Sequence, residues 1–448
     1  MKLKLPEKVI YIIETLESHG FEAYVVGGCV RDSILARTPG DWDITTSATP
    51  AQVKQIFRRT IDTGIAHGTV TVLLEKDMFE VTTYRIDGKY EDSRHPKEVT
   101  FTASLEEDLK RRDFTINAMA YNDRTGLVDL YGGMHDLQHK VIRCVGDPKE
   151  RFCEDALRML RAVRFAAQLG FSIDPNTAQA IRELADTLER ISAERIQTEI
   201  VKLLTSNHPG MWEACYTLGI TRIIMPEFDV CMMTPQMTPH HCYCVGEHIL
   251  WSMEGVPADK ILRLTMLLHD IGKPKSKVTD EKGRDHFYGH AKVSEEMARK
   301  ILHRLRFDND TVAKVTKLIR FHDTRPEPTS KQVRHLLYQI GEDLFPMYLA
   351  VRRADTMAQS GYLRNDKLER IDRIEAEYQE IIRRQECFSL KNLAISGKDL
   401  IRLGIEPGKE IGELLDLALQ LVLENPSLNN KAYLMNFAAA EHAKRWRG

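Results

Sequence analysis

Two adjacent glycines, Gly27 and Gly28, follow the short apolar run AYVV at residues 23–26. The run predicts a β-strand, and the glycines after it predict a tight turn into the next element. Because glycine has no side chain, the backbone of such a turn can approach a phosphate closely and present N–H groups to it. We therefore expect a strand, a glycine turn and a helix arranged around an anion site.

Two carboxylates stand one residue apart in GDWD, at Asp41 and Asp43. We predict a second strand over residues 41–45, in which alternate side chains share one face. Hard oxygen ligands on one face suit Mg²⁺, and with triphosphate oxygens they can hold two ions for in-line displacement. A lone D-x-D pattern is commonly a solvated turn, so this prediction depends on the nearby glycines and on Arg31.

The composition is that of an ordinary folded protein of several domains, with 448 residues, 43% hydrophobic residues, 29% charged residues and a net charge of −2. No run of 18 apolar residues occurs, so we expect no transmembrane helix and no membrane partner. The eight cysteines are scattered without a disulfide framework, which predicts a cytoplasmic location. Composition leaves the oligomeric state open.

Hydrophobic periodicity separates a mixed N-terminal region from a helical remainder. Residues 69–74 and 79–84 are interpreted as paired strands, and the polar stretch 85–99 as a mobile loop. From Asp147 onward, apolar residues recur with helical spacing. We therefore predict an α+β fold: a small head with a mixed or antiparallel sheet over residues 1–145, followed by all-α regions at 146–205, 206–360 and 361–448.

A single arginine-rich helix is predicted over residues 151–171, because the segment has strong helix formers and no internal glycine or proline before Gly170. On such a helix Glu154, Arg158 and Arg161 would share one arc, with Asp155 beside it and Arg164 continuing the row. A buried salt-bridge ladder is one interpretation of these charges.

Base recognition is the other interpretation of the arginine-rich helix. Cytosine and adenine both present an amino donor beside a ring-nitrogen acceptor. A carboxylate and an arginine, here Asp155 and Arg158, could read that pattern. Guanine and uracil have the reverse polarity and would leave buried groups unpaired. The helix could thus select C and A without a nucleic-acid template.

Five segments resemble, in order and spacing, the motifs of class II tRNA nucleotidyltransferases, the family of bacterial CCA-adding enzymes and poly(A) polymerases. These segments are GGCVRD (27–32), GDWD (40–43), RRDFTINAMA (111–120), EDALRMLRAVRFAAQLGF (154–171) and SAERIQTEIVKLL (192–204). The resemblance implies a nucleotidyltransferase head, neck, body and tail. It also implies addition of C, C and A from CTP and ATP to the tRNA 3′ end, with release of pyrophosphate.

The same resemblance implies roles for individual residues. Asp41 and Asp43 would be the catalytic Mg²⁺ ligands, and Gly28 and Arg31 would contact the triphosphate. The nucleotide pocket would be formed by Arg112, Asp155, Arg158, Arg161 and Arg164. In the alternative, Asp113 after Arg112 is only a helix cap.

Details of the motifs help to distinguish CCA-adding enzymes from A-adding enzymes and poly(A) polymerases within this family. The family usually has Gly where Ala36 stands and often Pro where Ala156 stands, and neither position is a proposed ligand. RIDGKYEDSRHP (85–96) resembles the intact loop of enzymes that add A. A basic, aromatic motif of the poly(A) polymerases is absent near residues 62–72, which favours CCA addition. An enzyme that adds only A, or a poly(A) polymerase, remains the alternative.

A block of histidines with LLHDIGKP (267–274) resembles the HD phosphohydrolase superfamily. The resemblance implies a transition-metal site with the ligands His248, His269, Asp270, His290, His322 and Asp355. The implied activity, second or principal, is that of a phosphatase or cyclic phosphodiesterase. A structural helical core is the alternative.

Two further patterns lie near the histidine block and in the tail. If residues 286–290 are helical, His286 and His290 share a face. Cys242 and Cys244, beside His240 and His241, are spaced too closely for a usual zinc site. In the tail, residues 369–386 and 395–412 predict helices, with a cap at Ser396, that could contact the tRNA acceptor arm through its backbone.

Overall fold

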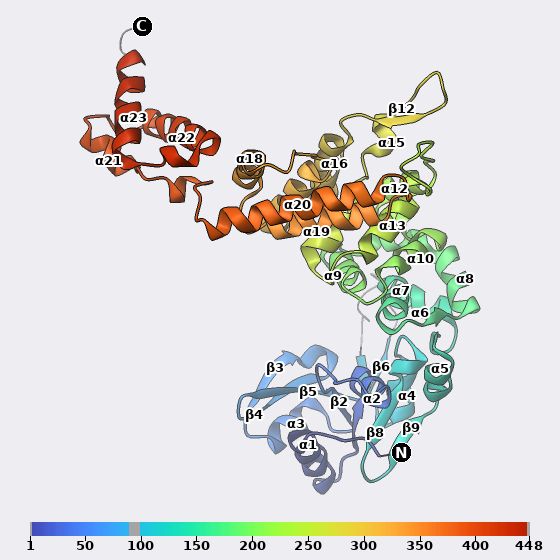
Figure 1. The fold of residues 1–448 in the computed structure, drawn as a ribbon. Helices are drawn as coiled ribbons and strands as arrows, with labels where there is room; N and C mark the ends of the chain where they lie inside the picture. The colour runs from blue at the N-terminus through green and yellow to red at the C-terminus, as the bar shows by residue number, and fades with distance from the viewer. Residues whose placement is uncertain (1, 89–98, 446–448) are drawn as a thin grey trace. The chain divides into compact units, whose positions relative to one another are not determined.

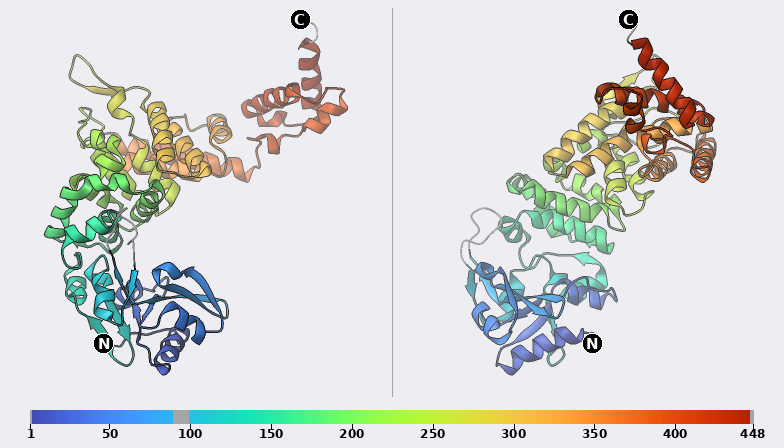
Figure 2. Two further views of the ribbon diagram at one scale, coloured as in Figure 1. Left: turned by 180° about the vertical axis from the view of Figure 1, so that it is seen from behind. Right: turned by 90° about the vertical axis from the view of Figure 1, so that its left-hand side faces the viewer.

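The computed structural model describes residues 2–88 and 99–445, which fall into two compact units. The first unit comprises the chain up to Asp229 together with Arg304–Arg306, and the second comprises Val230–His303 and the chain from Phe307 onward. Strands are concentrated in the first unit, and the second is almost entirely helical (Figures 1 and 2). The centre of the predicted mobile loop, residues 89–98, lies outside the described residues.

The head is built on a mixed seven-stranded sheet with the order β3-β4-β5-β2-β1-β8-β9. The strands are β1 (Ala23–Val26), β2 (Ile44–Thr46), β3 (Thr60–Gly64), β4 (Thr69–Leu74), β5 (Asp77–Thr83), β8 (Met119–Asn122) and β9 (Gly126–Asp129). Neighbouring strands are antiparallel except β2 and β5, which are parallel. The predicted α+β class with a mixed sheet is confirmed.

Short helices and smaller ladders complete the head. The four residues of β1 and of β8 are all buried, so the centre of the sheet forms the core. α1 (Glu7–Ser18) buries an apolar stripe with helical spacing. The remaining elements are α2 (Gly28–Ile34), α3 (Pro50–Ile56), η1 (Ile65–His67), β6 (Arg85–Asp87), β7 (Val99–Phe101), α4 (Leu105–Lys110), η2 (Thr115–Asn117), α5 (Gly133–His139) and β10 (Val141–Ile142).

The second predicted strand begins later than expected. We predicted a strand over residues 41–45, whereas β2 begins at Ile44 and both aspartates precede it. The reason is that β1 ends at Val26, whose N–H donates to the carbonyl of Asp43, and the chain then turns into α2. No further residue of β1 remains to pair with Asp41. The carboxylates therefore occupy the segment leading into the strand.

The predicted continuous helix over residues 151–171 is wrong. α6 (Pro148–Glu154) ends before Asp155, whose backbone is extended, and α7 (Leu157–Leu169) begins after Ala156. The carboxylate of Asp155 accepts a hydrogen bond from the N–H of Leu157, so it satisfies a free donor at the new helix start. Glu154 therefore does not continue the row formed by Arg158 and Arg161.

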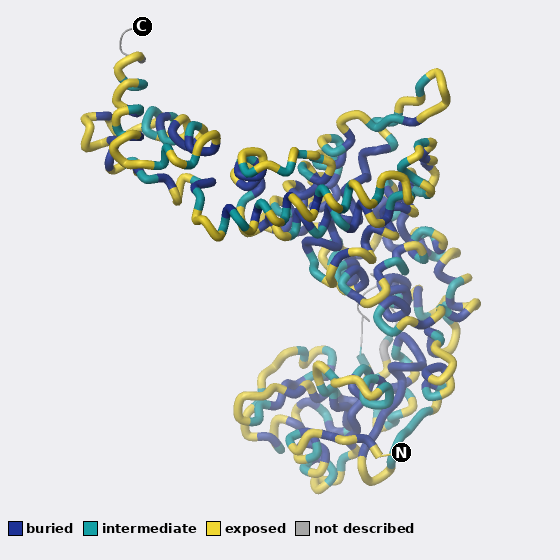
Figure 3. Tube along the Cα trace, in the orientation of Figure 1, coloured by how far each residue is buried: buried dark blue, intermediate teal, exposed yellow. Residues whose placement is uncertain are grey.

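After α7, the first unit continues with one short strand and a series of helices. They are β11 (Ser172–Ile173), which pairs with β10, then α8 (Pro175–Leu184), η3 (Ala185–Arg190), α9 (Ala193–Leu204), η4 (Pro209–Met211), α10 (Trp212–Thr217), α11 (Thr221–Ile224) and α12 (Pro226–Met232). Figure 3 shows buried residues along the inner sides of these helices. α7 buries nine of its thirteen residues, among them Arg164.

The second unit contains a helical core, one short hairpin and a terminal group of helices. The core elements are α13 (Val245–Glu254), α14 (Lys260–Leu268), α15 (Lys273–Ser276), β12 (Lys277–Thr279), β13 (Asp285–Phe287), α16 (His290–Arg304), α17 (Asn309–Phe321), α18 (Ser330–Ile340), α19 (Phe345–Met357) and α20 (Arg364–Arg383). The terminal group comprises η5 (Leu390–Asn392), α21 (Gly397–Arg402), α22 (Lys409–Glu424), η6 (Pro426–Leu428) and α23 (Lys431–Arg445).

Several helical predictions for this unit are confirmed, whereas the helical condition for His286 and His290 to share a face is not met. α20 lies where a helix was predicted over residues 369–386, and Ser396 precedes α21 with its N–H and hydroxyl both bonded to Asp399. His286 lies in β13 rather than on a helix with His290, and its Nε2 lies 2.9 Å from Asp280. Among the described residues, no helix is long and apolar enough to span a bilayer.

The packing of α5 against η2 can be tested at Gly133, the first residue of α5. A Cβ at this position would lie 2.5 Å from the carbonyl oxygen of Thr115 and 2.8 Å from Cγ of Met119. We expect Gly133→Ala to destabilise the head by about 1–3 kcal/mol through overpacking. Thermal unfolding followed by circular dichroism would measure the loss as a lower midpoint.

Gly64→Ala is the matched control in the same sheet. Its added Cβ would lie 3.5 Å from Cβ of Thr69, an ordinary contact, and its φ of −172° suits any residue. We expect its unfolding midpoint to stay near that of the wild type. Equal shifts for both variants would contradict the packing argument.

Candidate functional site

The two predicted metal ligands lie in the segment that leads into β2. Asp41 is exposed and Asp43 is half-buried. Burial and the neighbouring Asp41 carboxylate raise the pKa of Asp43 to about 6, against an opposing effect of Arg112. Two carboxylates that repel each other offer oxygen ligands whose charges a divalent cation would stabilise. The donor set therefore fits Mg²⁺.

The glycine turn packs against one of the predicted pocket arginines. Gly27 has φ of 82°, in the region that favours glycine, and a Cβ there would lie 3.1 Å from Nη1 of Arg112. Gly28 begins α2, and a Cβ on it would lie 3.7 Å from Nη2 of Arg31. The turn thus lies between two guanidinium groups, as a phosphate site requires.

A chain of hydrogen bonds joins Arg31 to the helix that carries the other arginines. Nη1 of Arg31 donates to Oδ1 of Asn117 at 2.7 Å, and Nδ2 of Asn117 donates to Oδ1 of Asp113 at 3.1 Å. Oδ2 of Asp113 accepts from Nε and Nη2 of Arg161 at 2.9 and 2.6 Å. The structure therefore brings Arg31 and Arg161 together through two residues of the RRDFTINAMA segment.

The ring of Phe165 lies among three arginines. The Cζ atoms of Arg31, Arg161 and Arg164 lie 5.0, 5.4 and 3.8 Å from the ring centroid. At these distances the negative face of the ring attracts each cation. Arg164 is also paired with the buried carboxylate of Glu199 on α9. The ring and Glu199 together hold a concentration of positive charge that suits an anionic ligand.

The predicted base-selecting pair is Asp155 and Arg158. Asp155 lies at the break between α6 and α7, and Arg158 lies in the first turn of α7. Asp155 accepts from Nη2 and Nη1 of Arg195 at 2.7 and 3.3 Å. Arg158 donates to the carboxylate of Glu154 and to the carbonyl of Arg111. Both side chains thus have protein partners, so contact with a base would require these partners to be shared or exchanged.

Asp113, Asn117 and Phe165 are site residues that the sequence did not reveal. Asp113 was weighed only as a helix cap, whereas its carboxylate joins Asn117 to Arg161. Polar residues placed among the apolar residues of this segment, Asp113, Thr115 and Asn117, were the available signal. Phe165 gave none, because an aromatic residue on an apolar helix is ordinarily part of the core.

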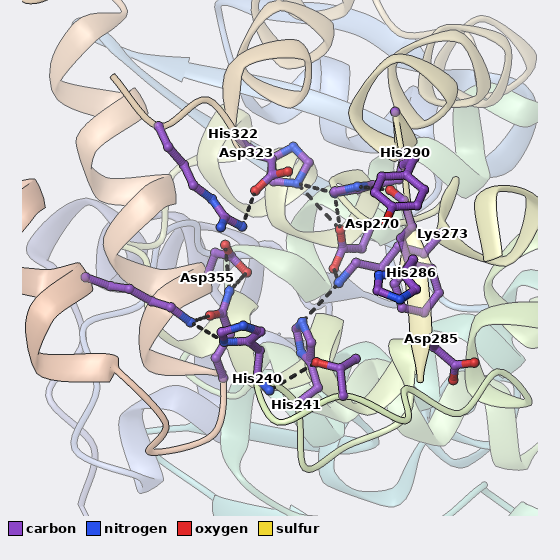
Figure 4. A pocket seen from close by; sticks show the side chains of 17 residues that line it. His240, His241, Asp270, Lys273, Asp285, His286, His290, His322, Asp323 and Asp355 are labelled. Atoms are coloured by element: carbon purple, nitrogen blue, oxygen red, sulfur yellow. Dashed lines mark hydrogen bonds and ion pairs between the residues drawn. The ribbon is translucent and has the colours of Figure 1, made fainter. Parts of the chain in front are cut away.

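The six predicted ligands of the histidine block meet in the second unit. Asp270, His290, His322 and Asp355 line the pocket drawn in Figure 4, whereas His248 and His269 are fully buried and are not among its lining residues. They come from α13, α16, α19 and the ends of α14 and α17. Two overlapping groups have ligand atoms within 4.8 Å of one another. These groups are His248, His269 and Asp270, and Asp270, His290 and His322. Asp355 adjoins the first group, with Oδ1 2.9 Å from Nε2 of His248.

The backbone fixes the orientation of three of these imidazoles. Nδ1 of His269, His290 and His322 lies 2.7, 2.9 and 2.7 Å from the carbonyl oxygen three residues earlier. A carbonyl can only accept, so each Nδ1 carries the proton and each Nε2 is free to bind a metal. Nε2 of His290 lies 3.1 Å from that of His322, and the corresponding distance between His248 and His269 is 3.3 Å. Facing lone pairs at these distances favour a cation.

Asp270 lies between the two imidazole pairs and is 1% exposed. Oδ2 lies 3.4 Å from Nε2 of both His248 and His269, and Oδ1 lies 3.4 and 3.5 Å from Nε2 of His290 and His322. Within the described part of the chain, neither oxygen accepts a well-aligned hydrogen bond. The donor set of imidazoles and buried carboxylates fits a transition-metal ion.

Basic residues adjoin this cluster. Nζ of Lys273 lies 2.6 Å from Oδ2 of Asp270 and 3.4 Å from Nε2 of His241. Burial and Lys273 lower the pKa of His241 to about 2. Cys242 and Cys244 take no part in the metal-capable groups formed by described residues. Cys244 instead caps the first turn of α13 through its sulfur.

Three family models match this sequence. The model of the Poly A polymerase head domain matches residues 23–143, and the model described as 'Probable RNA and SrmB-binding site of polymerase A' matches residues 170–232. The model for tRNA nucleotidyltransferase domain 2 matches residues 281–438.

The chain is also similar to curated proteins over most of its length. It is 36% identical to the CCA-adding enzyme of Enterococcus faecalis over 440 residues, which cover 97% of this chain and 95% of the relative. It is 36% identical to the CCA-adding enzyme of Levilactobacillus brevis over 431 residues, 92% of each protein. Identity to the CCA-adding enzyme of Lactiplantibacillus plantarum reaches 55% over 198 residues, or 44% of this chain and 49% of that protein.

Solved structures share the fold. The CCA-adding enzyme of Bacillus stearothermophilus in complex with CTP has a TM-score of 0.73 and 30% identity, covering 99% of this chain and 100% of that one. The Thermotoga maritima CCA-adding enzyme complexed with tRNA_CCA has a TM-score of 0.60 and 20% identity, covering 98% and 100%, and shows similarity of fold alone.

Asp113→Asn tests the buried connection between the head and α7. The arginines Arg161 and Arg158 hold the pKa of Asp113 well below its ordinary value of 3.8, although burial opposes them. Its stabilising contribution is therefore complete above pH about 4 and is lost only as the pH falls below the ordinary pKa. We expect the variant to lose about 1–3 kcal/mol in urea unfolding at pH 7, and still at pH 4.

Asp186→Asn is the control for this measurement, because Asp186 forms an exposed ion pair with Arg222. Exposed pairs contribute little, so its unfolding curve should match that of the wild type. A loss confined to pH 7 in the Asp113 variant would contradict the lowered pKa.

Proposed function

We propose that this chain, which belongs to the family of CCA-adding enzymes, adds C, C and A to the 3′ end of tRNA from CTP and ATP without a template. The observation that carries the proposal is the meeting of two kinds of group in one unit. Asp41 and Asp43 precede β2, whose neighbour β1 leads directly into the glycine turn between Arg31 and Arg112. The two aspartates can hold metal ions, and the glycine turn with its arginines can hold a triphosphate.

In the proposed reaction, the terminal 3′-hydroxyl of tRNA attacks the α-phosphate of CTP or ATP. A new P–O bond forms, the bond to the β-phosphate bridging oxygen breaks, and pyrophosphate leaves. Asp41 and Asp43 would hold Mg²⁺, which when bound would activate the hydroxyl and stabilise the leaving pyrophosphate. Gly28, Arg31 and Arg112 would hold the triphosphate, since backbone N–H groups and guanidinium forks suit phosphate oxygens.

Base selection is assigned in this proposal to Asp155 and Arg158. The carboxylate would accept from the exocyclic amino group and the guanidinium would donate to the ring nitrogen of cytosine or adenine. Asp155 is bonded to Arg195 in this structure, so the arriving base would have to share that carboxylate. Arg161 and Arg164 would complete the pocket, oriented by Asp113 and Glu199 respectively.

CCA addition is favoured over the A-adding and poly(A) alternatives, because the curated relatives that match this chain over more than nine-tenths of its length are CCA-adding enzymes. We assign catalysis to the head (1–145), nucleotide selection to the neck (146–205), the HD-type block to the body (206–360) and tRNA contact to the tail (361–448). A cytoplasmic location stays part of the proposal and is consistent with eight free cysteines.

Incorporation of labelled CTP and ATP into tRNA transcripts tests the proposal. Three transcripts, ending before CCA, after C and after CC, should each be completed to CCA. We expect Asp41→Ala to lower incorporation at least about a thousandfold, because two-metal catalysis loses a ligand. Filter binding of tRNA should change little, since the aspartate faces the nucleotide and metal.

Asp62→Ala serves as the control, because Asp62 is an exposed carboxylate of the same sheet that pairs with Lys54. It should retain full incorporation. Lack of incorporation on all three transcripts by the wild type would contradict CCA addition, and completion of only the CC transcript would assign the A-adding subtype.

We also propose that the histidine block binds transition-metal ions and hydrolyses a phosphoester. The supporting observation is that Asp270 directs one carboxylate oxygen to each pair of facing imidazoles. A bound ion would lower the pKa of water and polarise a phosphoryl oxygen. Hydrolysis would form one P–O bond from water and break another, and the leaving alcohol would take a proton.

His269→Ala tests this second function. Removal of an imidazole from the first ligand group should lower the bound Mn²⁺ or Ni²⁺, measured by elemental analysis after gel filtration. It should also abolish the opening of nucleoside 2′,3′-cyclic phosphate to the monophosphate and the release of inorganic phosphate from phosphomonoesters. CCA addition should persist. His335→Ala, a histidine of α18 paired with Glu424, should change neither property.

A structural role for the histidine block predicts a different result. Wild-type protein would then carry no metal after incubation and release no phosphate. Such an outcome would remove the second function and leave CCA addition untouched.

A further inference from the structure

The pocket beside the histidine cluster extends past the six ligands. It has a volume of about 380 Å³ and is lined on one part by Asp270, His290 and His322. Another part is lined by His240 and by two long cations, Arg325 and Lys367. Figure 4 shows His240 on the same side of the pocket as Asp355 and away from His290. We call His240, Arg325 and Lys367 the cationic arm.

Lys367, on α20, is the central member of the cationic arm. Its Nζ donates to Oε1 of Gln359 at 2.6 Å and lies 3.2 Å from Nδ1 of His240, so both of these partners are neutral groups. Burial is the largest cause of a lowered pKa for Lys367, and Arg325 is the next. The charged groups that act on it are Arg325, Arg352, Asp323 and Asp355.

Arg325 brings a second positive charge to the arm. Its closest acid is Asp323, at 2.9 Å, and both side chains are well exposed. An exposed pair of this kind is weak and leaves the guanidinium able to bind another anion. His240 stays neutral at neutral pH, because burial, Lys367 and Arg325 all lower its pKa. Two cations that repel each other thus face one pocket, and an anion between them would be stabilised.

Gln359 joins the cationic arm to the metal ligands. Its Nε2 donates to both oxygens of Asp355, at 3.2 and 3.1 Å, while its Oε1 accepts from Lys367. One side-chain amide therefore separates a proposed metal ligand from the central lysine. The arm lies next to the proposed reacting phosphate and is not itself part of the ligand set.

We infer that the cationic arm is a subsite for a second phosphate of the substrate that the histidine block hydrolyses. The scissile phosphate would face the metal ligands, and the second phosphate would accept from Lys367 and Arg325. The substrate class is a phosphoester with two phosphate groups close together. The second phosphate can come from the backbone of an RNA 3′ end or from a nucleoside bisphosphate. This inference rests on the proposed hydrolase function.

Matched substrates test the inference with the full-length protein in Mn²⁺. One pair is a dinucleotide ending in a 2′,3′-cyclic phosphate and the corresponding mononucleoside cyclic phosphate. The other is a nucleoside 3′,5′-bisphosphate and the 3′-monophosphate. Wild-type kcat/KM should be at least about tenfold higher for the member with two phosphates, because a charge-assisted contact is added. The pair with the larger preference identifies the source of the second phosphate.

Lys367→Met should remove this preference, lowering kcat/KM about tenfold for substrates with two phosphates and leaving the single-phosphate substrates unchanged. Lys367→Arg should restore part of it. Lys314→Met, which removes an exposed lysine paired with Asp310 on α17, should behave as wild type. Equal losses on both members of a pair, or no loss, would overturn the subsite.

Binding of inorganic pyrophosphate separates this inference from the hydrolase proposal. Calorimetric titration with pyrophosphate in EDTA compares wild type with Lys367→Met. Because the head is identical in the two proteins, any binding of pyrophosphate there contributes equally to both titrations. Weaker binding by the variant, about tenfold, supports the subsite even if no substrate is hydrolysed, in which case only the hydrolase function fails. Identical binding isotherms would overturn the subsite.

Discussion

The contact between the buried carboxylate of Asp113 and Arg161 is the interaction on which the proposed nucleotide site depends. Burying the carboxylate of Asp113 carries a desolvation cost, which is offset by two hydrogen bonds from Arg161 to Oδ2 and one from the amide of Asn117 to Oδ1. The contact joins the segment before β8 to α7. Through Asn117 it also fixes Arg31 on α2. Two elements distant in the sequence, α2 and α7, thereby bring three arginines to one ring, that of Phe165.

The two proposed cation sites differ in how deeply their ligands are buried and in how far the ligands are oriented before a cation binds. Before β2, one carboxylate is exposed and the other half-buried, so water and a nucleotide can reach both. In the histidine block, the ligands are almost fully buried, and backbone carbonyls set three of the rings before any ion arrives. The first arrangement suits ions that arrive with a substrate. The second suits an ion that remains with the protein.

Local patterns explain which features were predictable from the sequence. β1 and the glycine turn depend on neighbouring residues, so short patterns revealed them. The break at Asp155 was missed because the surrounding residues favour a helix, although an aspartate that can cap a helix start, and the proline that the family often has at position 156, were available signals. The partners Arg195 and Glu199 were also missed, because pairing between helices is decided by tertiary packing rather than by spacing along the chain.

The hydrogen bond from Val26 to the carbonyl of Asp43 carries a consequence for how the site could evolve. It sets the distance, counted along the sheet, between the glycine turn proposed to receive phosphate and the two aspartates proposed to receive metal. Side chains alternate along a strand, so a slip of one residue would turn every side chain of β2 to the opposite face. The chain between α2 and β2 can therefore change in length only where the pairing of Val25 with Ile44 is kept. The spacing between the glycine turn and the two aspartates is therefore conserved whenever the register between β1 and β2 is conserved.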